Sequence, residues 1–172
     1  MKVYFVRHGK TDYSERNTKI YQGFGVNLAP LSEVGIQQIK ESAKDVRLQG
    51  AGIILTSPYT RAVQTAAILS CELGIDIAIE TDLYECLTNK YFEYDDRTVE
   101  DGYRDYQKNH GIYPDGEEKL WEDAASIRNR VLGVLDKYRQ FDKVIVAGHG
   151  LMIQATAGGM LSHNGEIVEF EC

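Results

Sequence analysis

Near its start the chain carries the stretch Val3-Tyr4-Phe5-Val6-Arg7-His8-Gly9-Lys10-Thr11, in which a β-branched and aromatic run stops at an Arg-His-Gly turn. An uninterrupted apolar run of this kind is typical of a strand that is covered on both faces. The stretch therefore predicts a buried strand over residues 2–6 that delivers Arg7 and His8 to its carboxyl end.

The length and composition of the chain are those of one globular domain. It has 172 residues, of which 43% are hydrophobic and 26% charged, so it can bury a sizeable core and is not expected to be disordered. Its net charge is −7, whereas nucleic acids and anionic membranes bind basic surfaces. We therefore expect a single domain over residues 1–172 with neither nucleic acid nor membrane as a partner. A bound phosphate would need a local positive field.

The cysteines and the apolar segments favour a cytoplasmic protein. Cys71, Cys86 and Cys172 are odd in number and widely spaced, and they show no ligand-like pairing. The first predicted strand begins close to Met1, so we expect no signal peptide. No apolar stretch reaches the ~18 residues that a membrane span needs. We expect a reducing setting in which each cysteine is unpaired.

Predicted strands and helices alternate along the chain. After Ser32, a plausible cap, apolar residues recur every three or four positions, which predicts a helix to about Leu48. Ser57 can cap a second helix, predicted over 59–73. The other predicted elements are strands over 53–56, 75–79, 143–147 and 166–171 and helices over 120–138 and 151–161. This order favours an α/β fold, a three-layer αβα architecture with an open, mostly parallel sheet.

Chemically suggestive residues follow three of the predicted strands. They are Arg7-His8-Gly9, Thr56-Ser57-Pro58 leading to Arg61, and Gly148-His149-Gly150. In an open parallel sheet the carboxyl ends of the strands lie at one edge, where ligands bind. We therefore expect His8, Arg61 and His149 to converge in an active site, together with Glu85, which follows the strand over 75–79.

The segment between the third strand and the next helix is irregular and rich in tyrosine and acidic residues. An insertion of this length in a compact domain is more often a lid or a binding element than a plain connector. We predict an inserted cap over about residues 83–118 that holds a helix or two of its own. Its acidic stretch over 91–106 is interpreted as a solvated face that would also discourage highly anionic substrates.

Five blocks of sequence carry a family resemblance. They are Arg7-His8-Gly9 with Thr11, Pro30-Leu31-Ser32-x-x-Gly35-x-x-Gln38, Ser57-Pro58-Tyr59-x-Arg61-Ala62-x-Gln64-Thr65-Ala66, Leu83-x-Glu85 and Gly148-His149-Gly150. Together they closely resemble the histidine phosphatase superfamily, the phosphoglycerate-mutase-like proteins. A lone Arg-His-Gly would carry little weight, but five blocks in the order of the family, over nearly the whole chain, make chance improbable.

The resemblance implies a mechanism in which His8 attacks phosphorus and forms a phosphohistidine that water then cleaves. It implies that Arg7, Arg61 and His149 bind the phosphoryl oxygens and that Glu85 protonates the leaving oxygen. The two arginines would also keep His8 neutral, because like charge lowers the pKa of a histidine. No metal or cofactor is then required, since arginine and histidine side chains supply the positive charge.

Other site residues implied by the resemblance are less well matched. Thr11, Ser14, Gln22 and Gly23 would support the phosphate or contact the substrate. The proton donor could instead be another carboxylate if the cap folds differently, and the candidates are Glu93, Asp95 and Asp96.

Several positions depart from the pattern of the family. Lys10 stands where Glu is frequent, Tyr13-Ser14 where Trp-Asn is, Ile20 where Arg is, and Glu118 where Ser is. Apart from Lys10, these changes remove positive charge or hydrogen-bond donors from around the phosphate. They disfavour a bisphosphate substrate.

The short chain favours hydrolysis, because the resemblance implies that mutases of this family have longer chains with a more elaborate cap. We predict a metal-independent phosphomonoesterase that acts on a small metabolite carrying one phosphate. The alternatives are a phosphotransfer mutase and, from another class, a non-catalytic phosphate-binding or protein-interaction module. Dephosphorylation of phosphohistidine or of a phosphoprotein would need a shallower site than the long cap suggests.

Overall fold

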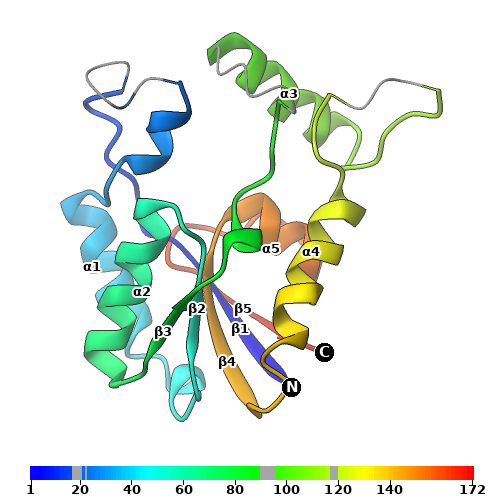
Figure 1. The fold of residues 1–172 in the computed structure, drawn as a ribbon. Helices are drawn as coiled ribbons and strands as arrows, with labels where there is room; N and C mark the ends of the chain where they lie inside the picture. Colours follow the sequence, from blue (N-terminus) through cyan, green and yellow to red (C-terminus); the bar gives the residue numbers. More distant parts are fainter. Residues whose placement is uncertain (17–20, 22, 90–95, 117–119) are drawn as a thin grey trace.

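The structure, a computed structural model, describes residues 1–16, 21, 23–89, 96–116 and 120–172. Within these residues the chain forms a five-stranded sheet in the order β3-β2-β4-β1-β5 (Figure 1). The strands are Lys2–Arg7 (β1), Ile54–Thr56 (β2), Ile77–Ile79 (β3), Lys143–Gly148 (β4) and Ile167–Glu171 (β5). The first four pair in parallel, and β5 runs antiparallel to β1 at the edge, which confirms the predicted open, mostly parallel sheet.

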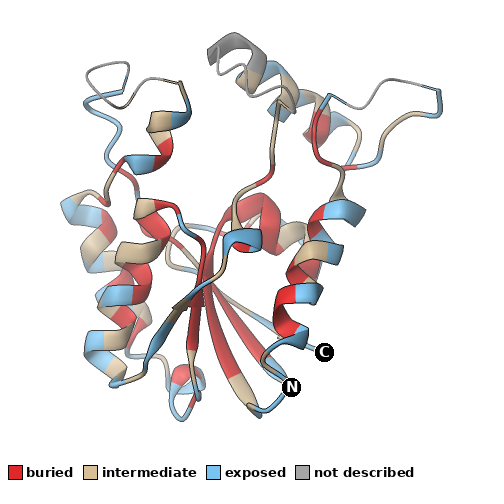
Figure 2. Cartoon of the chain, in the orientation of Figure 1, coloured by how far each residue is buried: buried red, intermediate tan, exposed pale blue. Residues whose placement is uncertain are grey.

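Helices cover both faces of the sheet and make the three predicted layers (Figure 1). They are α1 (Glu33–Ser42) and α2 (Thr60–Leu73) on one face, and α4 (Ala124–Asp136) and α5 (Gly150–Ala157) on the other. Successive side chains of a strand point to opposite faces. Val3 and Phe5 of β1 accordingly pack with α4 and α5, whereas Tyr4 and Val6 pack with α1 and α2. Figure 2 shows the resulting burial, which is concentrated in the central strands and the inner faces of the helices.

The first helix is shorter than predicted. Ser32 caps it, because its hydroxyl accepts a hydrogen bond from the Gly35 N–H at 3.1 Å. The helix ends at Ser42 rather than near Leu48. Asp45 takes an extended backbone there, and its carboxylate caps a separate 3-10 turn, η2 (Val46–Leu48).

The second helix begins at Thr60, so the expectation that Ser57 caps it is wrong. The Ser57 hydroxyl lies at the end of β2, where it accepts a hydrogen bond from the Tyr59 N–H at 3.3 Å. Gly74 ends the helix as predicted, in a left-handed conformation with φ of 69° that glycine adopts without strain.

The last two helices are also shorter than predicted. The first of them begins at Ala124 rather than Leu120, because the carboxylate of Asp123 accepts a hydrogen bond from the first turn and forms the cap. The second ends at Ala157 rather than Leu161, since Gly158 leaves the helical conformation with a φ of 80°.

The described part of the predicted cap contains one helix, α3 (Asp96–Lys108), which lies beyond the carboxyl ends of the strands (Figure 1). Trp121 joins it to the chain before α4, because its indole Nε1 donates a hydrogen bond to Oδ2 of Asp105 at 2.8 Å. The Trp121 ring also packs on those of Tyr106 and Tyr113, with centroids 5.2 Å and 3.8 Å away. These contacts hold α3 over the edge of the sheet that carries the candidate site.

Candidate active site

The carboxyl ends of β1 and β4 and the start of α2 bring two histidines and an arginine together. His8 follows β1 and His149 follows β4, and the centroids of their rings lie 5.3 Å apart. Arg61, on the first turn of α2, places its Nε 3.3 Å from Nε2 of His8. The parallel register that pairs Arg7 with Gly148 sets the two histidines side by side. The structure thus brings His8, Arg61 and His149 together as expected.

His8 is held as a neutral imidazole with one unprotonated nitrogen. Its side chain is buried, and its Nδ1 lies 2.8 Å from the carbonyl oxygen of Gly9. A carbonyl only accepts hydrogen bonds, so Nδ1 carries the hydrogen and Nε2 keeps its lone pair. Burial, followed by the positive charge of Arg61 and then that of Arg7, lowers the pKa of His8 to about 3. The ring is therefore uncharged near neutral pH, as a nucleophile must be.

Arg61 is a buried cation held between the sheet and the loop before α1. Its Nη1 donates a hydrogen bond to Oδ1 of Asn27 at 3.3 Å, in the 3-10 turn η1 (Gly23–Leu28). Its guanidinium carbon lies 4.9 Å from the centroid of the Tyr59 ring. Sequence reasoning does not single out Asn27, because one asparagine in a polar loop belongs to no recognisable pattern.

His149 is completely buried and is held by Ser57. Its Nε2 lies 2.8 Å from the Ser57 hydroxyl oxygen, and its ring stands edge-on to that of Tyr59. Burial, followed by the charges of Arg61 and His8, lowers the pKa of His149 well below its usual value. Sequence reasoning missed this contact of Ser57. The signal that could have found it is the position of Ser57 at the end of a buried strand.

Arg7 lies beside the turn that carries His149. Its Nη1 donates a hydrogen bond to the Ser162 carbonyl oxygen, and its Nε has no partner within the described chain. A Cβ built on Gly150 would lie 3.1 Å from Cζ of Arg7 and 2.8 Å from Cδ1 of Leu161. A side chain at this position would therefore force Arg7 and Leu161 to shift, and the second glycine of the Gly-His-Gly turn leaves room for both.

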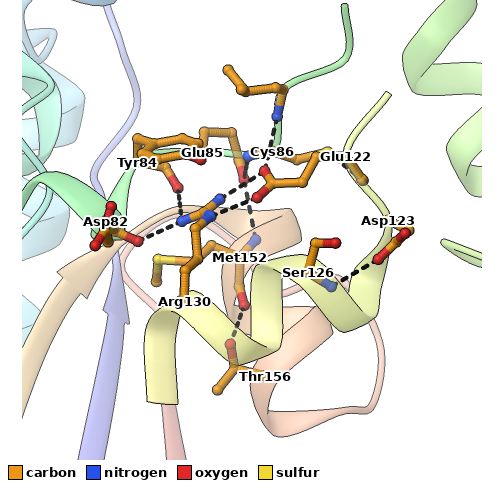
Figure 3. A network of polar contacts seen from close by, with 11 residues as sticks. Asp82, Tyr84, Glu85, Cys86, Glu122, Asp123, Ser126, Arg130, Met152 and Thr156 are labelled. Atoms are coloured by element: carbon orange, nitrogen blue, oxygen red, sulfur yellow. Dashed lines mark hydrogen bonds and ion pairs between the residues drawn. The ribbon is translucent and has the colours of Figure 1, made fainter. Parts of the chain in front are cut away.

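Glu85 directs its carboxylate at the first turn of α5, next to His149 in the chain. Its Oε1 accepts hydrogen bonds from the N–H groups of Cys86 at 2.9 Å and Met152 at 3.1 Å (Figure 3). Its Oε2 accepts a hydrogen bond from the Leu151 N–H at 3.4 Å. Glu85 also lines the same cavity as Arg61, so the structure places it at the candidate site.

A cavity of about 310 Å³ adjoins Arg61 and Glu85. This volume is at the small end of the range of ligand sites, ~300–1,000 Å³. Its wall combines charged, aromatic and aliphatic side chains from η1, α2, α3, α5 and the segments after β1 and η3. The lining residues are Tyr13, Arg16, Val26, Asn27, Tyr59, Arg61, Glu85, Cys86, Thr88, Val99, Glu100, Tyr103 and Leu151.

The remaining substrate-binding candidates are placed less favourably. Thr11 is buried, and its hydroxyl has no partner among the residues described. Ser14 is exposed, and neither it nor Gly23 lines the cavity, whereas Tyr13 does. Gln22 lies outside the described residues.

Several other expectations fall on parts of the chain that the structure does not describe. Of the alternative proton donors, Glu93 and Asp95 lie outside the described residues, and Asp96 is the first residue of α3. Ile20 and Glu118, two of the departures from the family pattern, also lie outside them. Glu85 is the one of these candidate donors whose side chain the structure describes, and it lines the cavity.

Metal-binding clusters and membrane-spanning helices are absent from the described residues. No group of three or more His, Cys, Asp or Glu side chains is placed there to hold a metal ion. No helix in the described part of the chain is long and apolar enough to cross a bilayer. The three cysteines are free thiols, and Cys86 is the buried one.

Known proteins resemble the chain in sequence. A family model described as the histidine phosphatase superfamily (branch 1) matches residues 3–169. The chain is 30% identical to the uncharacterized phosphatase PhoE of Bacillus subtilis (strain 168) over 156 residues, which cover 89% of this chain and 74% of that protein. It is 35% identical to the probable phosphoglycerate mutase GpmB of Enterobacter sp. (strain 638) over 86 residues, 49% of this chain and 38% of that one. The mutase match thus spans less than half the length of the mutase.

The fold also matches solved structures. A mycobacterial glucosyl-3-phosphoglycerate phosphatase has a TM-score of 0.71 to this chain, covering 98% of this chain and 88% of its own. The sequence identity of the pair is 20%, so the similarity establishes the fold and nothing finer.

Proposed function

This chain belongs to the histidine phosphatase superfamily, and we propose that it hydrolyses the phosphomonoester of a small metabolite with His8 as the nucleophile. The observation that supports this most directly is the neutral, buried His8, whose Nε2 lies 3.3 Å from Nε of Arg61. A lone pair beside a permanent cation is what in-line attack on a phosphoryl group requires.

In the first step, Nε2 of His8 attacks phosphorus from the side opposite the leaving oxygen. The P–N bond forms as the P–O bond breaks, and Glu85 gives its proton to the leaving oxygen. Arg61 exchanges its hydrogen bond with His8 for bonds to the phosphoryl oxygens. Arg7 and His149 bind the same group, so that its charge is neutralised as it transfers.

In the second step, a water molecule attacks the phosphohistidine and gives its proton to Glu85. The P–N bond breaks, which returns His8 to its neutral form and Glu85 to its acid form, and inorganic phosphate leaves. The reaction uses no metal ion in this proposal, because the guanidinium groups of Arg7 and Arg61 supply the positive charge.

The substrate we propose is a small metabolite with one phosphate. The cavity of about 310 Å³ supports this size. The free thiols of Cys71, Cys86 and Cys172 support a reducing, cytoplasmic setting.

A phosphotransfer mutase is the second candidate, because part of the chain matches probable phosphoglycerate mutases. A mutase would return the phosphoryl group from His8 to a hydroxyl of the substrate. A hydrolase passes it to water. The two are therefore separated by whether free phosphate or a rearranged phosphate ester accumulates.

The proposal is tested first by measuring phosphate release from a panel of phosphorylated metabolites. Reactions with labelled substrate are then quenched rapidly, without acid. We expect free phosphate and a transient acid-labile phosphate on His8, located by mass spectrometry. Rearranged ester without free phosphate would indicate the mutase. Binding of phosphate without turnover of any ester would indicate a non-catalytic module.

A further inference from the structure

The segment that carries Glu85 has little regular structure of its own. It follows the 3-10 turn η3 (Thr81–Leu83), and residues 84–87 lie in neither helix nor strand. A general acid must keep its carboxyl within hydrogen-bond reach of the leaving oxygen, so its backbone has to be held from outside.

Arg130 of α4 holds the amino-terminal side of Glu85. Its Nη1 donates hydrogen bonds to the carbonyl oxygens of Asp82 at 2.6 Å and Tyr84 at 2.9 Å (Figure 3). Its guanidinium carbon also lies 3.7 Å from the centroid of the Tyr84 ring, a cation–π contact. One side chain thus fixes the backbone immediately before Glu85.

Glu122, which precedes α4, holds the carboxyl-terminal side. Its Oε2 accepts a hydrogen bond from the Leu87 N–H at 3.3 Å, and its own N–H donates to the Leu87 carbonyl oxygen at 2.8 Å. Its carbonyl oxygen accepts a hydrogen bond from the Cys86 thiol at 3.6 Å. Glu85 therefore lies between two anchored stretches of backbone.

Arg130 and Glu122 act as one buried unit. Nε of Arg130 lies 2.7 Å from Oε1 of Glu122, and Nη2 lies 2.9 Å from Oε2, with side chains only 11% and 9% exposed. Well-packed apolar side chains often stabilise a protein as much as a buried ion pair does, so stability alone is a weak reason for this one. The forked geometry of the pair instead suits the orientation of its neighbours.

We infer that Arg130 and Glu122 are positioning residues that set the carboxyl of Glu85 at the cavity. The inference rests on the proposed function, in which Glu85 protonates the leaving oxygen. Neither residue is among those described as lining the cavity, whereas both bond the backbone on either side of Glu85. Their loss should therefore reproduce part of the loss of Glu85 and leave the rest of the reaction intact.

The test is the double variant Arg130→Met/Glu122→Leu, which removes both charges at once because a single change would strand a buried charge. We would measure kcat/KM for an activated aryl phosphate and for an alkyl phosphate. An activated aryl oxide needs little protonation. We therefore expect kcat/KM of the double variant to fall ~10- to 100-fold more for the alkyl ester than for the aryl ester. Arg130→Lys, which keeps the charge but loses the fork, should shift the ratio in the same direction, and it carries the test if the double variant does not fold.

Lys137→Met is the matched control. Nζ of Lys137 pairs with Oε2 of Glu80 at 2.7 Å, which also joins the end of α4 to the chain before η3 without touching residues 82–87. We expect this variant to keep the ratio of aryl to alkyl activity of the unmodified protein. Melting temperatures of all variants show whether the ratio follows stability.

Glu85→Gln supplies the reference for complete loss of the acid. Adding Arg130→Met/Glu122→Leu to Glu85→Gln should change the ratio no further, because the residues act through one group. Additive effects, equal losses on both esters in the double variant, or a Glu85→Gln variant without leaving-group selectivity would each overturn the inference. An unmodified protein that releases phosphate from neither ester would instead contradict the proposed function.

Discussion

The cradle at the strand ends and the outer wall of the cavity differ in how firmly they are held. The cradle, defined as His8, Arg61 and His149, is 8%, 6% and 0% exposed, and it stands on β1, α2 and β4. The outer wall, defined as Tyr13, Glu100 and Tyr103, consists of exposed side chains, and those of Tyr13 and Tyr103 are 45% and 39% exposed. Groups packed on a rigid scaffold keep their geometry, whereas exposed loop and helix residues can change with little loss of stability. We expect the cradle to set the chemistry and the wall to tune the choice of substrate.

The largest expected effect is in the cradle. His8→Ala removes the only nucleophile in the proposed mechanism, so kcat should fall by roughly 10⁴-fold or more. Turnover of an aryl phosphate measures the loss, and circular dichroism checks the fold. Residual turnover within tenfold of the unmodified protein would show that another group attacks phosphorus.

Glu85 lies between the cradle and the outer wall. Its carboxylate accepts a hydrogen bond from the first turn of α5, and its side chain also lines the cavity. Glu85→Gln should lower kcat/KM for alkyl esters by about 10²- to 10³-fold and for activated aryl esters much less, because in the step that expels the leaving oxygen only the former need a proton on it. A plot of log kcat/KM against leaving-group pKa should steepen. An equal loss for both classes would assign the proton to a different residue.

The cradle should also make stability depend on pH. Burial lowers the pKa of His8 from 6.5 to about 3 in the folded protein and lowers that of His149 in the same direction. Between these two pKa values the unfolded chain binds more protons than the folded protein does. The contribution of the histidines to the free energy of unfolding is therefore complete above their pKa in the unfolded chain, and it is lost as pH falls towards their pKa in the folded protein. The free energy of unfolding should change with pH by up to ~1.4 kcal/mol per pH unit for each histidine.

Urea unfolding across about pH 4 to 7 measures this slope. His8→Asn should reduce it by the share of one histidine, whereas His163→Asn, at an exposed position, should leave it unchanged. The same slope in all three proteins would show that His8 titrates normally in the folded state.

The smallest expected effect is on the outer wall. The Glu100 side chain is 64% exposed and pairs with Arg104 at 3.4 Å. Glu100→Gln should raise kcat/KM for an alkyl phosphate with a carboxylate by about two- to fivefold relative to a neutral one, because it removes a partly screened negative charge. Glu41→Gln, which changes a similarly exposed carboxylate away from the cavity, is the control. An identical ratio in both variants would remove Glu100 from substrate selection.

Sequence reasoning predicted the layers and the order of the elements because each depends on short-range patterns. Local patterns predict these elements without any knowledge of what they pack against. Examples are the apolar runs of β1 and β4 and the three- and four-residue spacing of apolar residues in α2. Helix ends were predicted less well, because a nearby polar side chain decides them. Asp45 and Asp123 cap the turns that follow them, whereas the apolar spacing continues past both positions and predicts longer helices.

Sequence reasoning predicted the two histidines and the arginine of the candidate site, but it missed the residues that support them. His8, Arg61 and His149 follow strand ends in recognisable motifs. Asn27 and Ser57 carry no such mark, and they matter only because Arg61 and His149 lie against them.

By itself the sequence determined that buried parallel strands end in Arg-His-Gly and Gly-His-Gly turns, since strand burial and turn chemistry are properties of a few adjacent residues. Only the tertiary structure decided which distant groups meet there. Ser57 bonds His149 across 92 positions of the chain, and Arg130 bonds the Tyr84 carbonyl across 46. Such pairs depend on how helices and strands pack in space, and no local periodicity records that packing.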